Sequence, residues 1–446
     1  MRKKISLTEG SVKKSLIDLT IPMIFGMLGL IVFNLVDTFF VSMLGTNELA
    51  ALSFTYPVVL ILNSISLGIG MGAASLVSRA VGANDFKRIK RYATDSLTLG
   101  ALVVFIVMII GLNTIEPVFR LLGATDELMP IITSYMRIWY IGVIFVVIPM
   151  VGNNSIRALG DTKTPSLIML VAAIVNTILD PILIFGLGPF PRLEVPGAAI
   201  ATVFSRMITF SVAIYVLGYR DKILSIKGAG INQIIDSWKN ILYIGVPNAV
   251  IKIIQPIGVG IITGLLANIS IEAVAGFGIA AKIERFAIII IGALSVVAVP
   301  FIGQNYGGKK FTRIKEALKE SYKIIFVTAV IVYFILLLSS NFIGGLFSDD
   351  VEVVNVFTTY IRIISMFYGI YGIQLIGNSF FNAINEPFKA SMITAVQMFV
   401  IFIPMAILTS EPFGIYGIFG SLAFSFLTAG ILSHYLMYKK MKEWNQ

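Results

Sequence analysis

The stretch SLIDLTIPMIFGMLGLIVFNLVDTFFVSMLG, from Ser15 to Gly45, decides the fold of this chain. It is mostly apolar, and it is longer than the about 20 residues that a helix needs to cross a bilayer. A carboxylate, Asp37, nevertheless lies inside it. A charged side chain in a membrane helix costs about 2.5–3.5 kcal/mol, so such residues usually face a cavity and have a function. The stretch therefore predicts a membrane-spanning helix that carries a functional group.

The composition of the whole chain points the same way. Hydrophobic residues make up 57% of it, charged residues only 13%, and the mean hydropathy is +0.91. Soluble domains carry about 25% charged residues. The net charge of +10 does not indicate nucleic-acid binding, because the basic residues flank apolar runs. The chain has no cysteine, which excludes disulfides and thiol chemistry. Its only histidine, His434, does not form a cluster.

Apolar runs between charged or turn-rich breaks predict twelve membrane spans. We place them at about 16–43, 50–78, 95–115, 131–156, 164–187, 195–219, 240–267, 273–303, 321–343, 355–382, 389–410 and 414–438. The loops on one side, with both termini, hold 26 of the 34 Lys and Arg residues, and the opposite loops hold two. By the positive-inside rule both termini are cytoplasmic. The sequence thus predicts a multi-pass protein of the cytoplasmic (inner) membrane.

The two halves of the chain resemble each other at a constant offset of 225 residues. Tyr135-Met-Arg137 matches Tyr360-Ile-Arg362, and Pro22 matches Pro247. Six spans per repeat place both repeats in the same orientation, related by a pseudo-two-fold axis along the membrane normal. We therefore expect an all-α protein of two six-helix lobes. The predicted parts are an N-lobe at 1–219, a cytoplasmic linker at 220–239 and a C-lobe at 240–446.

Two predicted spans of the N-lobe carry carboxylates beside amides. Asn34 and Asp37 are three residues apart, and Asn176 and Asp180 are four apart, so each pair shares a helix face. Pro181 leaves a backbone carbonyl free near Asp180. Such oxygens suit a hard cation. The same carboxylates could instead bind a proton, since burial disfavours their charged form, or form a structural hydrogen-bond cluster.

Several charged residues also lie within predicted spans. Lys252, Lys282 and Arg285 lie near Glu284 in the C-lobe, and the simplest interpretation is a buried ion-pair cluster. Arg206 lies in the N-lobe, one turn from Thr202. Because an unpaired guanidinium is costly at that depth, we expect Asp37 or Asp180 to be its partner.

These motifs together resemble the multidrug and toxic compound extrusion (MATE) family, over nearly the whole chain. The matching segments are Pro22, Asn34–Gly45, Arg79–Gly82, Gly152-Asn153, Gly160-Asp161, Asn176 with Asp180-Pro181, and Gly197–Thr202. The resemblance implies export of cationic or amphipathic compounds, driven by inward H⁺ or Na⁺ flow. Within the family the chain looks closest to the DinF-like branch.

The resemblance also implies which residues form the site. The branch's cation site maps to Asp37, Asn176, Asp180 and Thr202, which would take H⁺ or Na⁺. The NorM-like branch uses a glutamate where this chain has Gln255. Candidates for the substrate cavity are Phe33, Asn34, Asn153, Met169, Arg206 and Gln255.

The sequence thus predicts a secondary multidrug exporter that is not an enzyme, since no span carries an HExxH motif. Its expected partners are small molecules and the lipid bilayer. No cofactor is expected besides the coupling ion, and a monomer is expected. The alternative is a flippase for lipid-linked sugars, whose phosphates would bind cations such as Arg206 and Lys252. A structural membrane protein is the third class, and it would leave Asp37 and Asp180 unexplained.

Overall fold

The structure is a computed structural model that describes residues 7–225 and 230–444, and every regular element in those ranges is a helix. The basic residues Arg2, Lys3, Lys4 and Lys227 lie outside the described residues. The first half contains α1 (Val12–Ser42), α2 (Thr46–Gly82), α3 (Phe86–Leu121), α4 (Met129–Gly142), α5 (Ile144–Ala158), α6 (Lys163–Phe185), α7 (Val195–Tyr215) and the π-helix η1 (Val216–Arg220). The second half contains α8 (Ile231–Ala267), α9 (Ile271–Ala287), α10 (Ile289–Gly307), α11 (Phe311–Phe347), α12 (Val351–Ser365), α13 (Tyr368–Ala383), α14 (Pro387–Ala395), the π-helix η2 (Val396–Phe402) and α15 (Ile403–Glu443). The predicted all-α class is confirmed.

Length and composition qualify nine helical stretches of the described chain as membrane spans, or eleven when each bent pair counts as one. The pair α4 and α5 bends by 44°, and the pair α12 and α13 bends by 58°. The two bent pairs coincide with the predicted spans 131–156 and 355–382. We predicted each of these spans as one continuous helix. The chain is therefore a multi-pass membrane protein, and the count of twelve spans remains a prediction.

The last helical stretch, Pro387–Glu443, is too long for one crossing. Its 57 residues would extend about 85 Å at 1.5 Å per residue, against about 30 Å of hydrocarbon. Gly414 has a φ of 55° and breaks the helix. Beyond it the chain folds back. The evidence is that the Thr409 and Ser421 hydroxyls, which are 12 residues apart in sequence, lie 3.0 Å from each other. This hairpin is the observation that favours the predicted division into 389–410 and 414–438.

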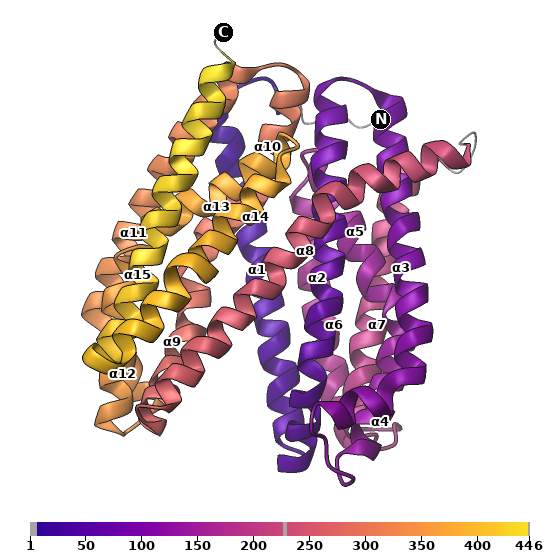
Figure 1. The fold of residues 1–446 in the computed structure, drawn as a ribbon. Helices are drawn as coiled ribbons and strands as arrows, with labels where there is room; N and C mark the ends of the chain where they lie inside the picture. The colour runs from indigo at the N-terminus through magenta and orange to yellow at the C-terminus, as the bar shows by residue number, and fades with distance from the viewer. Residues whose placement is uncertain (1–6, 226–229, 445–446) are drawn as a thin grey trace. The chain divides into compact units, whose positions relative to one another are not determined.

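The described chain divides into two compact units. Unit 1 contains residues Ile21–Ala249, and unit 2 contains Leu7–Thr20 and Val250 onward. Figure 1 shows long helices of unit 1 running alongside each other, such as α2 beside α3 and α6 beside α7. The chain passes from one unit to the other inside α1 and again inside α8. The predicted lobe boundaries at 219 and 240 remain a prediction, although residues 231–239 of the predicted linker are helical.

The helices of unit 1 pack closely against one another at glycine positions. A Cβ atom added at Gly72 of α2 would lie 2.4 Å from the carbonyl oxygen of Ile241 in α8, so only glycine allows this approach. A Cβ at Gly142 would lie 2.2 Å from the side chain of Val203, where α4 packs on α7. Small residues permit such close packing in membrane proteins, where helix association relies on van der Waals contact.

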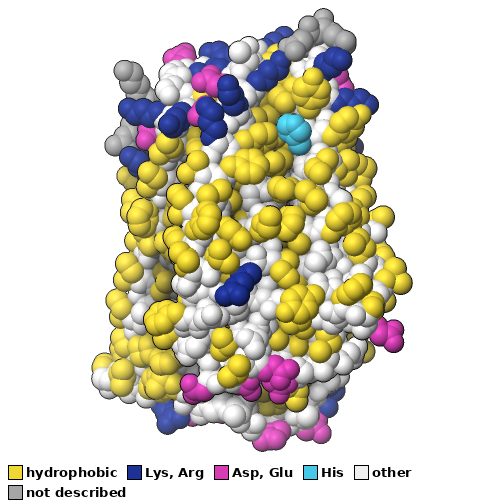
Figure 2. Space-filling model, turned by 90° about the vertical axis from the view of Figure 1, so that its left-hand side faces the viewer, with side chains coloured by type: hydrophobic (Ala, Val, Ile, Leu, Met, Phe, Trp, Pro, Cys, Tyr) yellow, Lys and Arg dark blue, Asp and Glu magenta, His cyan; other side chains and the backbone are white. Residues whose placement is uncertain are grey.

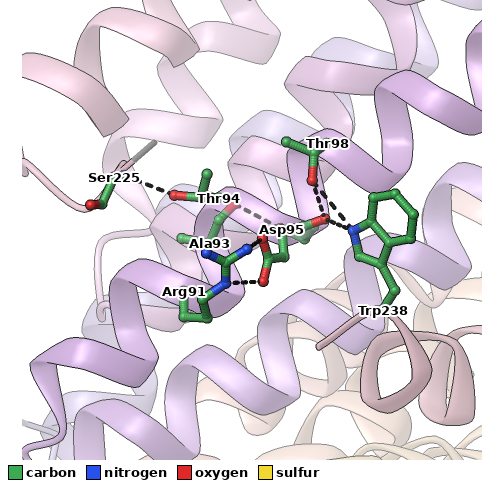
Figure 3. Close-up of polar contacts among 8 residues, drawn as sticks. Arg91, Ala93, Thr94, Asp95, Thr98, Ser225 and Trp238 are labelled. Atoms are coloured by element: carbon green, nitrogen blue, oxygen red, sulfur yellow. Dashed lines mark hydrogen bonds and ion pairs between the residues drawn. The ribbon is translucent and has the colours of Figure 1, made fainter. Parts of the chain in front are cut away.

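A polar network connects the segment after η1 and the beginning of α8 to the N-terminal part of α3 (Figure 3). Arg91 forms an ion pair with Asp95, whose side chain is buried. The Trp238 indole donates to the Asp95 carbonyl oxygen at 3.0 Å, and the Ser225 amide donates to the Thr94 hydroxyl at 2.9 Å. These contacts hold both sides of the predicted linker against α3.

In unit 2 the first described residues are bound by the end of α10 and the start of α11. Arg313 donates to the carbonyl oxygens of Leu7, Glu9 and Gly10 at 2.7–3.1 Å. The side chains of Gln304 and Asn305 bind the amide and the carbonyl of Leu7. Leu7 itself is buried. We call this arrangement the N-terminal clamp; it fixes the start of the chain before α1 begins.

Charge is distributed unevenly on the surface. On the face drawn in Figure 2, most Lys and Arg side chains gather at one end, together with a few Asp and Glu. Asp and Glu predominate at the other end, and hydrophobic side chains form a band between the two ends. This distribution matches a protein that spans a membrane and agrees with the loop-charge asymmetry used to predict its orientation. The orientation itself remains a prediction.

Candidate functional site

The centre of the candidate site in unit 1 is a carboxylate–amide pair on α6. The Asn176 amide Nδ2 donates to Asp180 Oδ1 at 2.9 Å. Both side chains are fully buried. Their spacing of four residues places them one turn apart, so this contact follows directly from the helix. The amide satisfies only one of the two carboxylate oxygens.

Three oxygen atoms of the site are inaccessible to solvent and have no hydrogen-bond partner among the residues that the structure describes. They are Asp37 Oδ1, Asn176 Oδ1 and Asp180 Oδ2. Asp37 of α1 lies close enough to Asp180 for the two carboxylates to interact electrostatically. Buried polar atoms are normally paired, and an unpaired one needs an explanation. Two like charges and three free acceptors fit a proton or a small cation that neutralises the pair.

The fourth predicted ligand, Thr202, is less clearly part of this group. Thr202 lies on α7, which packs against α6, and it is partly buried. Its carbonyl oxygen accepts a bond from the Ser205 hydroxyl at 2.8 Å. In the described chain its own hydroxyl makes no hydrogen bond to the other three residues. The structure therefore brings together Asp37, Asn176 and Asp180, and leaves the part of Thr202 as a prediction.

Arg206 lies over an aromatic ring and forms no ion pair within the described residues. Its guanidinium carbon is 4.8 Å from the centroid of Phe33, a cation–π distance. It interacts electrostatically with Asp37, but its Nε is buried and has no hydrogen-bond partner within residues 7–225 and 230–444. The predicted partner is thus an electrostatic neighbour and not a direct contact. An unbonded guanidinium over an aromatic ring can receive an anion.

The other predicted cavity residues occupy varied environments. Asn34 is exposed and donates to the Leu30 carbonyl at 2.9 Å. Asn153 is buried, and its Oδ1 has no hydrogen-bond partner in the described part of the chain. Met169 is partly buried. Gln255, in unit 2, is exposed and donates to the Tyr371 hydroxyl at 3.3 Å. Their role in a substrate cavity stays a prediction.

The expected buried ion-pair cluster of the second half is not formed. Lys252, Lys282 and Arg285 are exposed, and none of them forms an ion pair in the described part of the chain. Glu284 is partly buried and instead accepts a hydrogen bond from the Tyr360 hydroxyl at 2.9 Å. Sequence proximity suggested pairing, but the side chains of Glu284 and Arg285 leave their helix in different directions.

The sequence interpretation missed a tyrosine beside the unit 1 carboxylates. Tyr135 of α4 is buried and interacts electrostatically with both Asp37 and Asp180. The repeat contained the signal, because Tyr135 and Tyr360 are equivalent positions 225 residues apart. Each of the two tyrosines lies beside a carboxylate of its own unit.

Comparison with known proteins extends these observations. The MatE family model matches residues 22–182 and 247–408. The two matches begin 225 residues apart, which confirms the internal repeat. A protein named FAD transporter from Shewanella oneidensis is 37% identical over 98% of this chain and 96% of its own length.

Two further proteins are similar over most of their length. The multidrug export protein MepA of Staphylococcus aureus is 27% identical, over 93% of this chain and 91% of its own. The crystal structure of a mutant of the Vibrio cholerae MATE transporter VcmN gives a TM-score of 0.92 at 26% identity, covering 98% of this chain and 99% of that one. The fold of the described chain is therefore that of solved transporters of this kind.

Proposed function

Because the chain belongs to the MatE family of transporters, we propose that it is a secondary active exporter that uses inward H⁺ or Na⁺ flow to drive an amphipathic substrate outward. The observation that carries the proposal is the group of three partnerless oxygens on Asp37, Asn176 and Asp180. A driving cation needs a buried site whose occupancy changes the local charge, and this group has that chemistry.

In this proposal the coupling ion binds between Asp37 and Asp180. Without a cation the two carboxylates repel each other, since they are close and buried. A proton or Na⁺ removes the repulsion and supplies partners for the free oxygens. Occupancy would then favour a different packing of α1 against α6, which links ion binding to helix rearrangement. Thr202 would add a hydroxyl oxygen if Na⁺ is the ion.

For the substrate we favour an anionic aromatic molecule of the flavin dinucleotide class. The Shewanella relative is named for FAD transport, and Arg206 holds a guanidinium that lacks hydrogen bonds in the described chain, over the Phe33 ring. Guanidinium groups bind phosphates through paired hydrogen bonds. FAD combines a pyrophosphate with flat aromatic rings, so it offers a partner for both side chains.

Two other substrate classes remain alternatives. The MepA relatives support export of multiple drugs, and the carboxylates would then also attract cationic compounds. A lipid-linked sugar shares the pyrophosphate chemistry of FAD, which keeps the flippase alternative open. A flavin dinucleotide accounts more directly than either class for two observations together. These are the Arg206 guanidinium over the Phe33 ring and the Shewanella relative named for FAD transport.

Transport by the purified protein in lipid vesicles tests these assignments. A pH gradient is imposed with and without a Na⁺ gradient, and uptake of FAD and of a fluorescent cationic dye is measured. We expect gradient-driven FAD transport, and we expect Arg206→Gln to reduce it by about tenfold or more, the effect of about 1.5–3 kcal/mol for a hydrogen bond to a charged group.

Arg137→Gln is the matched control, because Arg137 is an exposed arginine of the same unit. It should leave FAD transport near the unmodified level. Dye transport without FAD transport would identify a drug exporter and overturn the flavin assignment. Movement of a lipid-linked pyrophosphate in place of either would favour the flippase.

A further inference from the structure

Unit 1 has a charged pocket at the corner where α3 ends and α4 begins. The pocket has a volume of about 440 Å³ and is open to solvent. Its corner belongs to the predicted loop between the spans 95–115 and 131–156, on the side opposite the termini. The charged and hydroxyl side chains that line it are Glu116, Arg120, Asp126, Thr133, Ser134 and Arg137. We call this arrangement the corner pocket.

The four charged groups of the corner pocket sum to zero but are unevenly paired. Arg120 forms ion pairs with Glu116 at 2.9 Å and with Asp126 at 2.7 Å, so one arginine serves both carboxylates. Arg137 is exposed and makes no ion pair or hydrogen bond in the part of the chain that the structure describes. Exposed ion pairs are weak, so either carboxylate can accept from a further cation. The pocket therefore offers a free guanidinium on one side and a shared pair of carboxylates on the other.

The arginine lies deeper in its predicted span than the carboxylates do. α4 starts at Met129, so Arg137 lies about 12 Å along this helix at 1.5 Å per residue. Asp126 precedes α4, and Glu116 lies near the end of α3. A phospholipid headgroup has the same order of charge, because its phosphate is attached next to the acyl chains and its amine lies farther out. The corner pocket thus matches a zwitterionic headgroup in both sign and sequence of charge.

The internal repeat provides the deeper half of this pocket a second time, but not the outer half. Arg362 and Thr358 on α12 are the equivalents of Arg137 and Thr133, and Arg362 is also exposed and without an ion pair in the described chain. The outer charges have no charged equivalents in unit 2, where the matching residues are Asn341, Gly345 and Val351. Unit 2 therefore contains a comparison site with the arginine and without the carboxylates.

We propose that the corner pocket binds the headgroup of a zwitterionic phospholipid that carries a primary amine, such as phosphatidylethanolamine. The Arg137 guanidinium donates paired hydrogen bonds to the phosphate, and the Thr133 hydroxyl adds a third donor. The ammonium group donates to Glu116 and Asp126, whose carboxylates only accept. A choline headgroup has no N–H to donate, and a phosphoglycerol headgroup has no cation. The pocket therefore selects the amine.

Native mass spectrometry of the purified full chain tests the proposal. The protein is titrated with phosphatidylethanolamine, phosphatidylcholine and phosphatidylglycerol that carry the same acyl chains. We expect phosphatidylethanolamine to bind about tenfold more tightly than the other two, the effect of a hydrogen bond between charged groups. Arg137→Gln should weaken its binding by about tenfold or more. A Glu116→Gln, Asp126→Asn double variant should lower its affinity to that of phosphatidylcholine and leave phosphatidylcholine binding unchanged.

Arg362→Gln is the matched control, because it removes the equivalent arginine from the unit that lacks the carboxylates. It should keep the preference for phosphatidylethanolamine, and the apparent melting temperature of each variant shows that it is folded. Glycerophosphoethanolamine and inorganic phosphate, which have no acyl chains, should not displace the lipid at equal concentration. Equal affinity for the three lipids, or unchanged binding in Arg137→Gln, would overturn the proposal, and displacement by the free headgroup would identify a site for a soluble ligand instead. Lipid retention is measured without gradient or substrate, so its outcome is independent of the proposed transport function.

Discussion

Asp161 and Glu386 are equivalent positions of the two repeats, and each forms an ion pair with a basic residue from the end of a later helix of its own unit. Arg220 Nη2 lies 2.7 Å from Asp161 Oδ2, and Lys440 Nζ lies 2.8 Å from Glu386 Oε1. Asp161 lies two residues before the start of α6, and Glu386 lies directly before the start of α14. The repeat has therefore kept an acid at this position, as Asp or Glu, whereas the basic partner comes from a position that is not equivalent, since the 225-residue offset takes Arg220 to Asn445.

The Asp161 ion pair should make stability sensitive to acid. Burial alone would raise the pKa of Asp161, but hydrogen bonds from Thr164 and Arg220 hold it below its usual value. A lowered pKa in the folded state adds stability that is present above the unfolded value of about 4 and is lost as the pH falls through the folded value. We expect Arg220→Gln to cost about 1–2 kcal/mol at pH 7 and to flatten the dependence of stability on pH below 5. Thermal unfolding at several pH values measures this.

Lys222→Gln provides the comparison for that experiment, since Lys222 is an exposed lysine two residues away. It should unfold like the unmodified protein at every pH. If Arg220→Gln and Lys222→Gln behave alike, the ion pair contributes nothing measurable.

Asp37→Asn should abolish gradient-driven transport while leaving the fold intact. The change keeps the size of the side chain but removes the negative charge that a proton or Na⁺ would neutralise. We expect transport to fall at least tenfold in vesicles, with an unchanged elution profile in size-exclusion chromatography. Asp18→Asn alters an exposed aspartate of the same helix and should retain full transport; full transport by Asp37→Asn would refute the coupling site.

Membrane orientation can be measured directly, because the chain has no cysteine. Single cysteines at Asn47, Glu272 and Asp349 should react with an impermeant thiol reagent added outside intact cells. Cysteines at Lys87 and Lys310 should react only after the membrane is opened. These positions lie in loops or at helix ends of the described chain, and the opposite pattern of labelling would reverse the predicted topology.

Gly72 should tolerate no side chain. A Cβ atom there would lie 2.4 Å from the Ile241 carbonyl oxygen, so Gly72→Val forces α2 away from α8. We expect a loss of about 1–3 kcal/mol, as for overpacked cores, seen as a lower apparent melting temperature. Gly260→Ala is the control, because a Cβ at Gly260 meets nothing within 4 Å. Similar melting temperatures for the two variants would contradict the packing described.

The sequence predicted the local features of this protein and missed those set by packing between helices. Family membership confirms two predictions. The chain is a membrane protein with an internal repeat, and it is a transporter and not an enzyme. The Asn176–Asp180 contact could be predicted because four residues make about one helical turn. The partner of Arg206 could not, since helix spacing does not determine which ring or carboxylate a long side chain reaches on another helix.

The bends of the structure illustrate the same limit. The break between α4 and α5 falls at Val143, while the nearest proline, Pro149, lies within α5. A proline pattern therefore does not locate this bend, which lies next to the close contact between Gly142 and Val203. The turn at Gly414, in contrast, was visible in the sequence as a break between two apolar runs.

The N-terminal clamp has a consequence for how the protein is made. Leu7 is synthesised about 300 residues before the side chains that bind it, which are Gln304, Asn305 and Arg313. At about 5–20 residues per second this delay is roughly 15–60 s. The segment Leu7–Thr20 therefore stays without these contacts while most of the protein enters the membrane, and unit 2 is completed only late in synthesis. A separately expressed second half would begin without Leu7–Thr20, the segment that completes its own unit.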